Sequence, residues 1–339
     1  MGAVKGLKKL WAKGLVNATL RNAQRRHQEL LDESSWPEEC HHEHPKWLVE
    51  TINNDWGDDA AEVIEANNQK APMWIRVNAL KHSAQEYQAK LNDVNIESEI
   101  SNASDVGVLL KRPVAVTKLP DFDSGACSVQ DESAQRAAQI LDCQPDDVVL
   151  DVCAAPGGKT GHILERTPQI SKVVAVDISE SRLAKVRDNL TRLGFSEKAE
   201  LTQGDATTPE NWSAEQLFNR ILLDVPCSGT GVIRRHPDIK YLRRPEDIDA
   251  LAALQQEILR ASWPLLKPGG TMLYATCSII SQENQQNIAS FVAATSDANC
   301  ISIEFLEAEN CRDALGLGYR ISPKSNRDGF YYALLKKAE

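Results

Sequence analysis

Apolar and polar positions along the second half of the chain alternate in a way typical of strands followed by helices. Short runs of branched apolar residues predict buried parallel strands, and longer stretches with apolar residues every three or four positions predict amphipathic helices. The predicted strands are Val148–Cys153, Val173–Asp177, Glu200–Thr202, Arg220–Asp224, Thr271–Cys277, Ile301–Phe305 and Phe330–Leu335. The predicted helices are Ser128–Leu141, one that follows AAPGGKT, Ser179–Gly194, Pro245–Leu266 and Gln282–Ala294. Regular strand–helix alternation predicts an α/β domain with a doubly wound, mainly parallel sheet.

A smaller unit with a different pattern precedes this region. Strands are predicted at Met73–Asn78, Ile96–Ile100, Val106–Leu110 and Val114–Val116. A helix is predicted at Ser83–Val94, with Ser83 as its N-cap. Residues 71–127 are therefore predicted to form a small α+β domain, and residues 128–339 the large α/β domain.

Residues 1–70 are predicted to be mainly helical. In residues 2–33, apolar side chains such as Val4, Leu7 and Trp11 recur at helical spacing, and lysines occupy the other face. Residues 32–44 are polar and contain three histidines without a cysteine at zinc-finger spacing, so a linker is favoured over a metal site. Helical patterning resumes from Pro45 to Asn67.

Composition changes this picture little, but the distribution of charge adds to it. The chain has 339 residues, a net charge of −10 and eight cysteines without metal-type or CxxC pairing. With no long apolar run and no secretory pattern, we expect a cytoplasmic protein with reduced thiols that does not bind membranes. Basic residues concentrate in two places: Lys5, Lys8, Lys9, Lys13, Arg21, Arg25 and Arg26, and the segment from Arg234 to Arg244.

Such basic patches on an acidic protein suit RNA that is held at a few phosphates. The N-terminal basic helix is interpreted as an RNA-contacting element, with an organellar transit peptide as the alternative. Arg76 and Asn78, on the first predicted strand, are expected to face either RNA or the next domain, or to be ordinary solvent-facing positions.

A glycine-rich turn carries the cofactor signal. AAPGGK follows a predicted strand and opens a helix, where Gly157 and Gly158 let the backbone approach a ligand closely. The turn is not GxGxxG, which argues against a dinucleotide. Asp177 ends the next strand, where an acid accepts ribose hydroxyls, and Asp205 follows the third strand near an adenine edge. Seven strands in this setting fit the Rossmann-like fold of the S-adenosylmethionine methyltransferases.

Two cysteines follow neighbouring strands. Cys227 lies in DVPCSG and Cys277 in YATCS, and both thiols are expected to face one pocket. C5 of a pyrimidine takes a methyl group only after a thiolate has added to C6, which pushes electron density onto C5. Either cysteine could be that nucleophile, and a pair of small buried hydrophobic residues is the alternative.

The motifs CAAPGGKT, AVDISESRL, LLDVPCSGTGVIRRHPD, YATCS and DGFYYALL resemble those of the RsmB (Fmu/Sun) family of RNA 5-methylcytosine methyltransferases. The resemblance covers nearly the whole chain. KGLVNATLRNAQRR resembles the end of the family's NusB-like helical RNA-binding domain, most of which is missing here, and EANNQKAPMWIRVN resembles its small RRM-like domain.

The resemblance implies roles for individual residues. Cys277 would attack C6, Cys227 would promote release of the methylated product, and Asp224 would contact the cytosine and the cofactor. The other implied cofactor-binding residues are Cys153, Ala154, Ala155, Pro156, Gly157, Gly158, Lys159, Asp177 and Asp205, and the implied RNA-binding residues are Arg234, Arg235 and His236, to which Arg76 is added.

The expected partner is 16S ribosomal RNA before assembly of the small subunit, and the expected state is a monomer. The target base must leave its stack, so looped or single-stranded RNA is the expected substrate. Three alternatives remain: another RNA (tRNA or large-subunit ribosomal RNA), a DNA cytosine methyltransferase, and a ribosome-assembly RNA-binding factor without turnover. DVPC in place of NPPY argues against methylation of an exocyclic nitrogen.

Overall fold

The computed structural model describes residues 9–32, 38–213, 216–324 and 326–339, and the chain divides into two compact units, 1–49 and 50–339. In the first unit, the predicted helix is found as α2 (Lys13–Arg25) and α3 (His27–Leu30), followed by α4 (Glu38–His42) and the start of α5 (Lys46–Trp56). The predicted basic and apolar positions at Val4, Lys5, Leu7 and Lys8 lie outside the described residues, as does the linker around Pro37.

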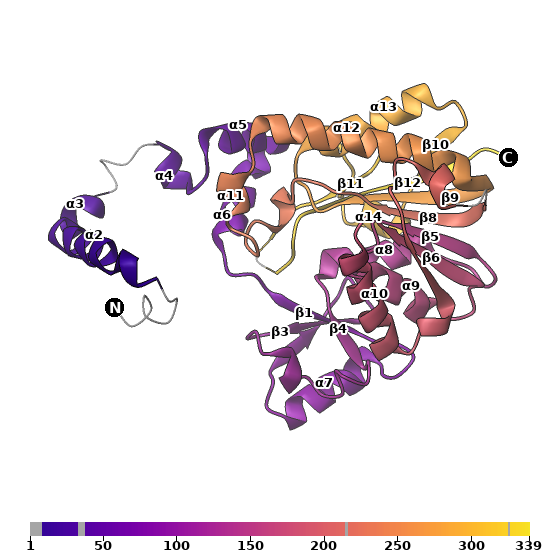
Figure 1. The fold of residues 1–339 in the computed structure, drawn as a ribbon, viewed down its shortest axis with the longest axis horizontal. Helices are drawn as coiled ribbons and strands as arrows, with labels where there is room; N and C mark the ends of the chain where they lie inside the picture. The colour runs from indigo at the N-terminus through magenta and orange to yellow at the C-terminus, as the bar shows by residue number, and fades with distance from the viewer. Residues whose placement is uncertain (1–8, 33–37, 214–215, 325) are drawn as a thin grey trace. The chain divides into compact units, whose positions relative to one another are not determined.

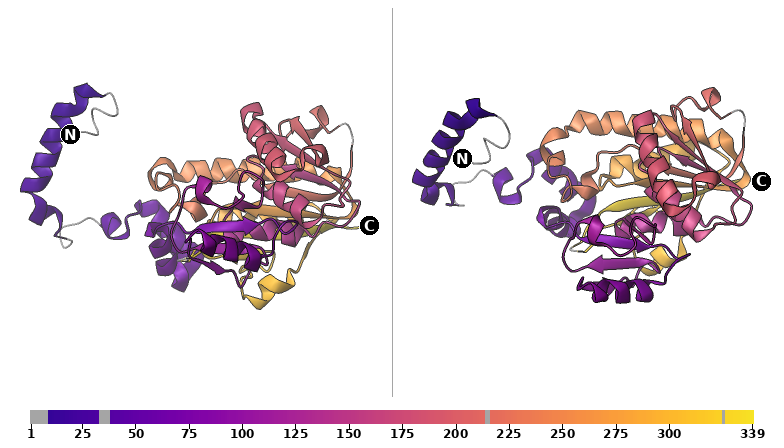
Figure 2. Two further views of the ribbon diagram at one scale, coloured as in Figure 1. Left: turned by 90° about the horizontal axis from the view of Figure 1, so that it is seen from below. Right: turned by 60° about the horizontal axis from the view of Figure 1, so that its bottom comes forward.

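The second unit begins with the rest of α5 and with α6 (Ala60–Asn68), which together form the helical stretch predicted up to Asn67. A small antiparallel sheet follows, built from β1 (Met73–Val77), β2 (Ser98–Ile100), β3 (Gly107–Leu110) and β4 (Cys127–Val129) in the order β2-β3-β1-β4. Helix α7 (Ala84–Asp93) lies against this sheet (Figure 2). Its Ala84, Tyr87 and Leu91 side chains join the core between helix and sheet. Ser83 caps α7 as predicted, in a reciprocal capping box with Glu86.

The large sheet contains eight strands, seven of which form one path in the order β10-β12-β9-β8-β5-β6-β7. These are β5 (Val148–Val152), β6 (Lys172–Asp177), β7 (Ala199–Gln203), β8 (Phe218–Asp224), β9 (Leu266–Thr276), β10 (Ala298–Ile301) and β12 (Phe330–Lys337). The pairs formed among β5, β6, β7, β8 and β9 are parallel, and β12 is antiparallel to both β9 and β10. The predicted α/β fold with a doubly wound, mainly parallel sheet is confirmed.

Helices cover both faces of this sheet (Figure 1). Helices α8 (Glu132–Leu141), α9 (Gly158–Arg166) and α10 (Glu180–Leu193) pack on one face, and α12 (Pro245–Ser262) and α13 (Gln285–Ala294) on the other. Successive residues of β8 point alternately into the two layers: Leu222 joins the first, and Ile221 and Leu223 join the second. A strand buried on both faces needs a continuous apolar run, which explains the sequence ILLD.

Four elements differ from the sequence-based expectation. Val114–Val116 is not a strand; a 3₁₀ turn, η4 (Val116–Lys118), occupies this region. The strand predicted at Ile301–Phe305 is mostly wrong, because β10 ends at Ile301 and α14 spans Glu304–Ala308. The short strands β4 and β11 (Tyr319–Ile321) were not predicted. β11 pairs with β12 at the side of the main path.

Arg76 lies at the junction of the two sheets and not on the surface. Its side chain is fully buried, and its guanidinium donates to both oxygens of Glu165 in α9 at 2.8 Å. It also donates to the Gly158 carbonyl oxygen and the Gln130 amide oxygen, both at 2.6 Å. The predicted RNA contact of Arg76 is therefore wrong, and the alternative that it faces the next domain agrees with these contacts.

Within the described residues, no helix is long and apolar enough to cross a membrane.

Candidate active site and cofactor pocket

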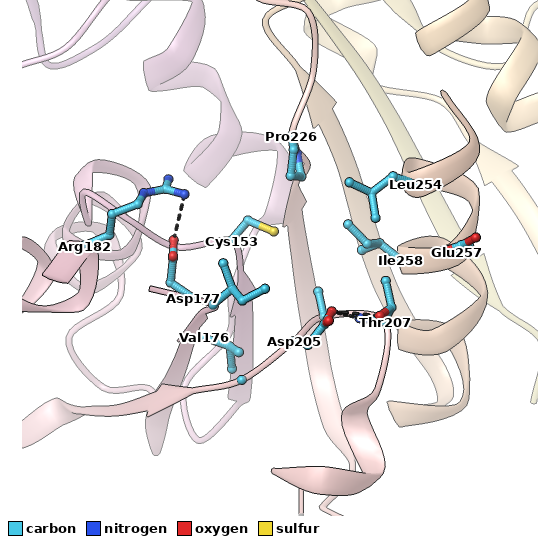
Figure 3. Close-up of a pocket in the computed structure, with 13 residues that line it drawn as sticks. Cys153, Val176, Asp177, Arg182, Asp205, Thr207, Pro226, Leu254, Glu257 and Ile258 are labelled. Carbon is cyan, nitrogen blue, oxygen red and sulfur yellow. Dashed lines mark hydrogen bonds and ion pairs between the residues drawn. The ribbon is translucent and has the colours of Figure 1, made fainter. Parts of the chain in front are cut away.

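A cavity of about 370 Å³ opens at the carboxyl ends of β5, β6, β7 and β8. Figure 3 shows the lining side chains converging from these strand ends and from α12. They are Cys153, Val176, Asp177, Ile178, Arg182, Gly204, Asp205, Ala206, Thr207, Pro226, Leu254, Glu257 and Ile258. Open α/β sheets bind ligands at this edge, because loops diverge there and leave a crevice.

Two carboxylates line the cavity from neighbouring strands. Asp177 is almost fully buried at the end of β6, where it accepts hydrogen bonds from the backbone N–H groups of Ala155 at 3.3 Å and Ser179 at 3.0 Å. Arg182 forms an ion pair with it at 3.4 Å (Figure 3). Asp205 is exposed, and hydrogen bonds from the backbone and hydroxyl groups of Thr207 lower its pKa. Both acids therefore offer acceptor oxygens to the cavity, and the lowered pKa of Asp205 keeps that carboxyl ionised at neutral pH.

The glycine-rich turn runs from Cys153 to Lys159 between β5 and α9. Gly157 is the N-cap of α9 and has φ +92°, a conformation that favours glycine. A Cβ there would meet Val186 Cγ1 at 3.0 Å and Val186 Cα at 3.1 Å. Cys153 holds a positive φ of 63° without being glycine, which costs backbone strain. The turn is thus closely fitted to α10 on one side and leaves its other side to the cavity.

Lys159 and Asp224 form an ion pair between the turn and the end of β8, with Nζ 2.6 Å from Oδ2. Burial alone would lower the pKa of Lys159, but the charge and hydrogen bond of Asp224 outweigh it and raise that pKa. Beneath the pair lies Asp151, which is fully buried and accepts a hydrogen bond from Thr160 Oγ1 at 2.6 Å. Burial raises the pKa of Asp151 to about 7.

The two cysteines face each other. Cys227, after β8, and Cys277, after β9, have their sulfur atoms 3.4 Å apart, as expected from the pairing of the two strands. The hydrogen bond with Cys277 raises the pKa of Cys227 well above its ordinary value, and burial raises it further. Cys227 therefore remains a thiol at neutral pH and can donate a hydrogen bond to the Cys277 sulfur.

The basic loop after Cys227 is mostly internal. The Arg234 guanidinium is buried and forms an ion pair with Asp328 at 2.8 Å. Arg235 pairs with Asp328 and, at 2.9 Å, with Asp131. The expectation that these two side chains clamp RNA is therefore wrong: both are already engaged by carboxylates, and the loop holds α8 and the approach to β12 together. His236 is exposed, so it remains the accessible member of the cluster.

The cavity has the chemistry that a nucleoside with an amino acid attached requires. Ile178, Leu254 and Ile258 supply apolar surface for a purine ring, and the carboxylates supply acceptors for hydroxyl and amino groups. Such a cavity on a sheet of this strand order defines the class of the protein. It is an S-adenosylmethionine-dependent methyltransferase.

Comparisons with known proteins narrow this class. Residues 138–336 match the family model described as 16S rRNA methyltransferase RsmB/F, and residues 44–117 match its ferredoxin-like domain. A curated relative from Yersinia enterocolitica, ribosomal RNA small subunit methyltransferase B, is 48% identical over 98% of this chain and 75% of its own length. The chain belongs to the RsmB/F family.

Solved structures agree with the family assignment. The crystal structure of PH0851 is 30% identical, with a TM-score of 0.83 over 88% of this chain and 67% of that chain. A methyltransferase homologue from Pyrococcus horikoshii is 28% identical, with a TM-score of 0.76 over 91% of this chain and all of that chain.

Some residues of the site were not predicted from the sequence. The apolar lining from α12, Leu254 and Ile258, gave no signal because these positions also satisfy an ordinary amphipathic helix. Glu283, a buried acid behind the two cysteines, was also missed. An acid shortly after YATCS, in a stretch that packs inside the protein, would have been the signal.

Proposed function

We propose that the protein methylates C5 of a cytosine in 16S ribosomal RNA through a covalent cysteine adduct. The 3.4 Å contact between the Cys227 and Cys277 sulfurs, at adjacent strand ends beside the cofactor cavity, carries this proposal. The names of the curated relatives support the ribosomal target. A mechanism with a single cysteine nucleophile would give no reason for a second thiol in contact with it, whereas a mechanism that uses one cysteine for attack and one for release requires both.

Cys277 is the nucleophile in this proposal. Its thiolate adds to C6 of the cytosine, and the electrons of the 5,6 double bond move toward C5. When bound, S-adenosylmethionine supplies an electrophilic methyl group on its sulfonium. After C5 has accepted that methyl group, the C5 proton leaves to solvent, the bond between Cys277 and C6 breaks, and the 5,6 double bond forms again.

Cys227 promotes the last step. As a thiol 3.4 Å from Cys277, it donates a hydrogen bond to the departing sulfur and thereby stabilises the leaving group. Asp224 contacts the amino edge of the cytosine, and Lys159 fixes the orientation of that carboxylate through the 2.6 Å ion pair.

The cofactor is held by the turn and by the cavity acids. The backbone of Cys153, Ala154, Ala155, Pro156, Gly157, Gly158 and Lys159 binds the methionine part; Asp177 binds the ribose, Asp205 the adenine edge, and Asp224 the methionyl end. The exposure of Asp205 and the burial of Asp177 in one cavity support this division. His236 remains as an RNA contact.

We also propose that residues 1–70, 71–127 and 128–339 act as a helical RNA-binding segment, a small RRM-like domain and the catalytic domain. The two family matches support separate small and large domains. The protein works in the cytoplasm as a monomer, on looped RNA that is not yet buried in an assembled small subunit.

Cysteine variants test the chemistry. We expect Cys277→Ala to lower methyl transfer to 16S ribosomal RNA at least 1,000-fold, because no adduct forms. Cys227→Ala is expected to accumulate a protein–RNA adduct that survives denaturing electrophoresis. Cys143→Ala, at a buried thiol outside the cavity, is the matched control and should behave like the unaltered protein. An adduct that accumulates in Cys277→Ala instead would reverse the two roles, and equal turnover on DNA of the same sequence would contradict the RNA substrate.

A further inference from the structure

Glu283 is a buried acid that joins the two cysteine-bearing loops. It ends the 3₁₀ turn η9 (Ser281–Glu283) behind the site, and its side chain is fully buried. Its carboxylate accepts hydrogen bonds from the Ser228 backbone N–H at 2.8 Å and the Ser228 hydroxyl at 2.6 Å. It also accepts one from the Ser278 hydroxyl at 2.5 Å. Ser228 follows Cys227 and Ser278 follows Cys277, so one carboxylate binds the residue next to each thiol.

The other contacts of Glu283 fix the same loops. Gln255 in α12 donates to Glu283 Oε1 at 3.1 Å and to the Pro226 carbonyl oxygen at 2.9 Å, which anchors the residue before Cys227 as well. The Tyr274 hydroxyl donates to the Glu283 carbonyl oxygen at 2.5 Å. Burying a carboxylate is costly unless donors replace its water, and four donors do so here. An apolar residue would fill the space without that requirement, so the acid indicates a role at the cysteines.

We propose that Glu283 is a positioning residue that holds the Cys227 thiol against the Cys277 sulfur. The hydroxyls of Ser228, Thr230 and Ser278 complete the link: Thr230 Oγ1 lies 3.2 Å from Ser278 Oγ and 3.0 Å from Ser228 Oγ. The serine after each cysteine, present in both motifs, is thereby explained as the point at which the carboxylate binds each loop.

The charge of Glu283 favours the protonated form of Cys227, as does the hydrogen bond between the two sulfur atoms. The Cys277 hydrogen bond, burial and the nearby charge of Glu283 all raise the pKa of Cys227. Among the described residues, the titratable groups that act on this thiol include Cys277 after β9, Glu283 in η9 and Tyr274 in β9. Arg243 lies in the same connection between β8 and α12 and donates to the Ser228 carbonyl oxygen at 3.0 Å. Glu283 is the carboxylate among them, so removing its charge makes the Cys227 thiolate easier to form.

Site-resolved alkylation of the full chain tests this directly. Glu283→Gln keeps the length of the side chain and loses its charge. We expect iodoacetamide at pH 8 to alkylate Cys227 roughly tenfold faster in this variant, because the reactive thiolate, the minor form at this pH, forms more easily without the nearby charge. Glu132→Gln is the matched control: Glu132 is also buried and accepts a hydrogen bond from Ser101 at 2.5 Å, away from the cysteines. An unchanged Cys227 rate in folded Glu283→Gln overturns the proposal.

A second variant covers the case in which Glu283→Gln does not fold. Ser278→Ala removes one donor to Glu283 and leaves the charge in place. With a mild two-electron oxidant such as diamide, the two thiols lose two protons and two electrons and form a Cys227–Cys277 disulfide. We expect this cross-link to form at least threefold more slowly in Ser278→Ala, because the loops are less tightly held. A rate equal to that of the unaltered protein overturns the positioning role.

The catalytic consequence rests on the proposed function and is measured separately. Glu283→Gln is expected to transfer methyl groups but to accumulate the protein–RNA adduct, as Cys227→Ala does, whereas a purely structural role would lower both steps together. Faster Cys227 alkylation without adduct accumulation would uphold the positioning of the thiols and contradict the release role of Cys227. Adduct accumulation therefore tests the release role of Cys227, and the alkylation rate tests the positioning role of Glu283 separately.

Discussion

Asp151 shows what burial does to a single carboxyl group beneath the site. It lies in β5 with no exposed surface, and only its Oδ2 atom has a hydrogen-bond partner among the described residues, the Thr160 hydroxyl. Burial raises its pKa from 3.8 to about 7. The folded protein therefore retains a proton that the unfolded chain releases between about pH 4 and 7. Stability from this group is complete below pH 4 and is lost as the pH rises through 7.

Asp151→Asn is expected to remove this pH dependence. The amide keeps an acceptor for Thr160 and has no charge to bury. The unfolding free energy of the variant relative to the unaltered protein should rise with pH, by at most roughly 1.4 kcal/mol per unit between pH 4 and 7. Urea unfolding at several pH values measures the difference. Parallel stability curves for the two proteins would show that Asp151 is ionised in the folded state throughout.

The roles of Arg234 and Arg235 could not be predicted from the residues next to them in the sequence. Within the sequence, Arg234 and Arg235 form a basic cluster next to a reactive loop, which is typical of phosphate binding. Their carboxylate partners, Asp131 and Asp328, lie about a hundred residues away in opposite directions along the chain. Local sequence cannot reveal such pairing. The two thiols, in contrast, were predictable because parallel strands bring their carboxyl ends to one edge.

At the scale of the element, the cofactor turn depends on the packing of α9 against α10. Gly157→Ala would place a Cβ 3.0 Å from Val186 Cγ1, at a residue whose φ is +92°. We expect at least a tenfold loss of S-adenosylmethionine affinity and a destabilisation of about 1–3 kcal/mol, from backbone strain and overpacking. Calorimetric titration and thermal unfolding measure the two effects.

Gly194→Ala is the control for that prediction. Gly194 caps α10 with φ +86°, but a Cβ there meets nothing within 4 Å. It should cost about 1 kcal/mol of stability and leave cofactor affinity within twofold. Equal affinities for the two variants would mean that the close approach to Val186 does not shape the turn.

The elements predicted correctly are those with long, strongly periodic patterns. Strand β8 and helix α10 match the predicted segments to within two residues. The missed strands β4 and β11 have three residues each, too few to show a periodic pattern. β4 forms by pairing with β1, which is distant in sequence, and β11 by pairing with the nearby β12. Helix α8 begins at Glu132, not at Ser128, because Asp131 caps it and Cys127–Val129 pairs with β1.

At the scale of the whole molecule, a buried ion pair between Arg76 and Glu165 joins the small sheet to α9, the helix that follows the glycine-rich turn. Arg76→Met leaves the buried Glu165 carboxylate without its cation, so we expect a loss of about 3–5 kcal/mol in unfolding free energy. The double variant Arg76→Met/Glu165→Leu should recover most of it, because neither charge is then buried. Lys90→Met, at an exposed ion pair with Asp121, should cost less than about 1 kcal/mol. Urea unfolding compares the three.

Two outcomes would contradict this account of the junction. If Arg76→Met cost no more than Lys90→Met, the pair would be as solvent-accessible as a surface pair. If the double variant were as unstable as Arg76→Met, the loss would come from packing and not from the orphaned charge.

Strand β12 has a consequence for how the protein is made. It is the last strand along the described chain, yet it lies inside the sheet between β9 and β10 and pairs with β9 along Tyr331–Lys336. During translation, β9 must therefore wait with an open hydrogen-bonding edge until those residues leave the ribosome exit tunnel. A nascent chain cannot complete this sheet around Cys277 before then, so methylating activity begins only after Tyr331–Lys336 have left the exit tunnel.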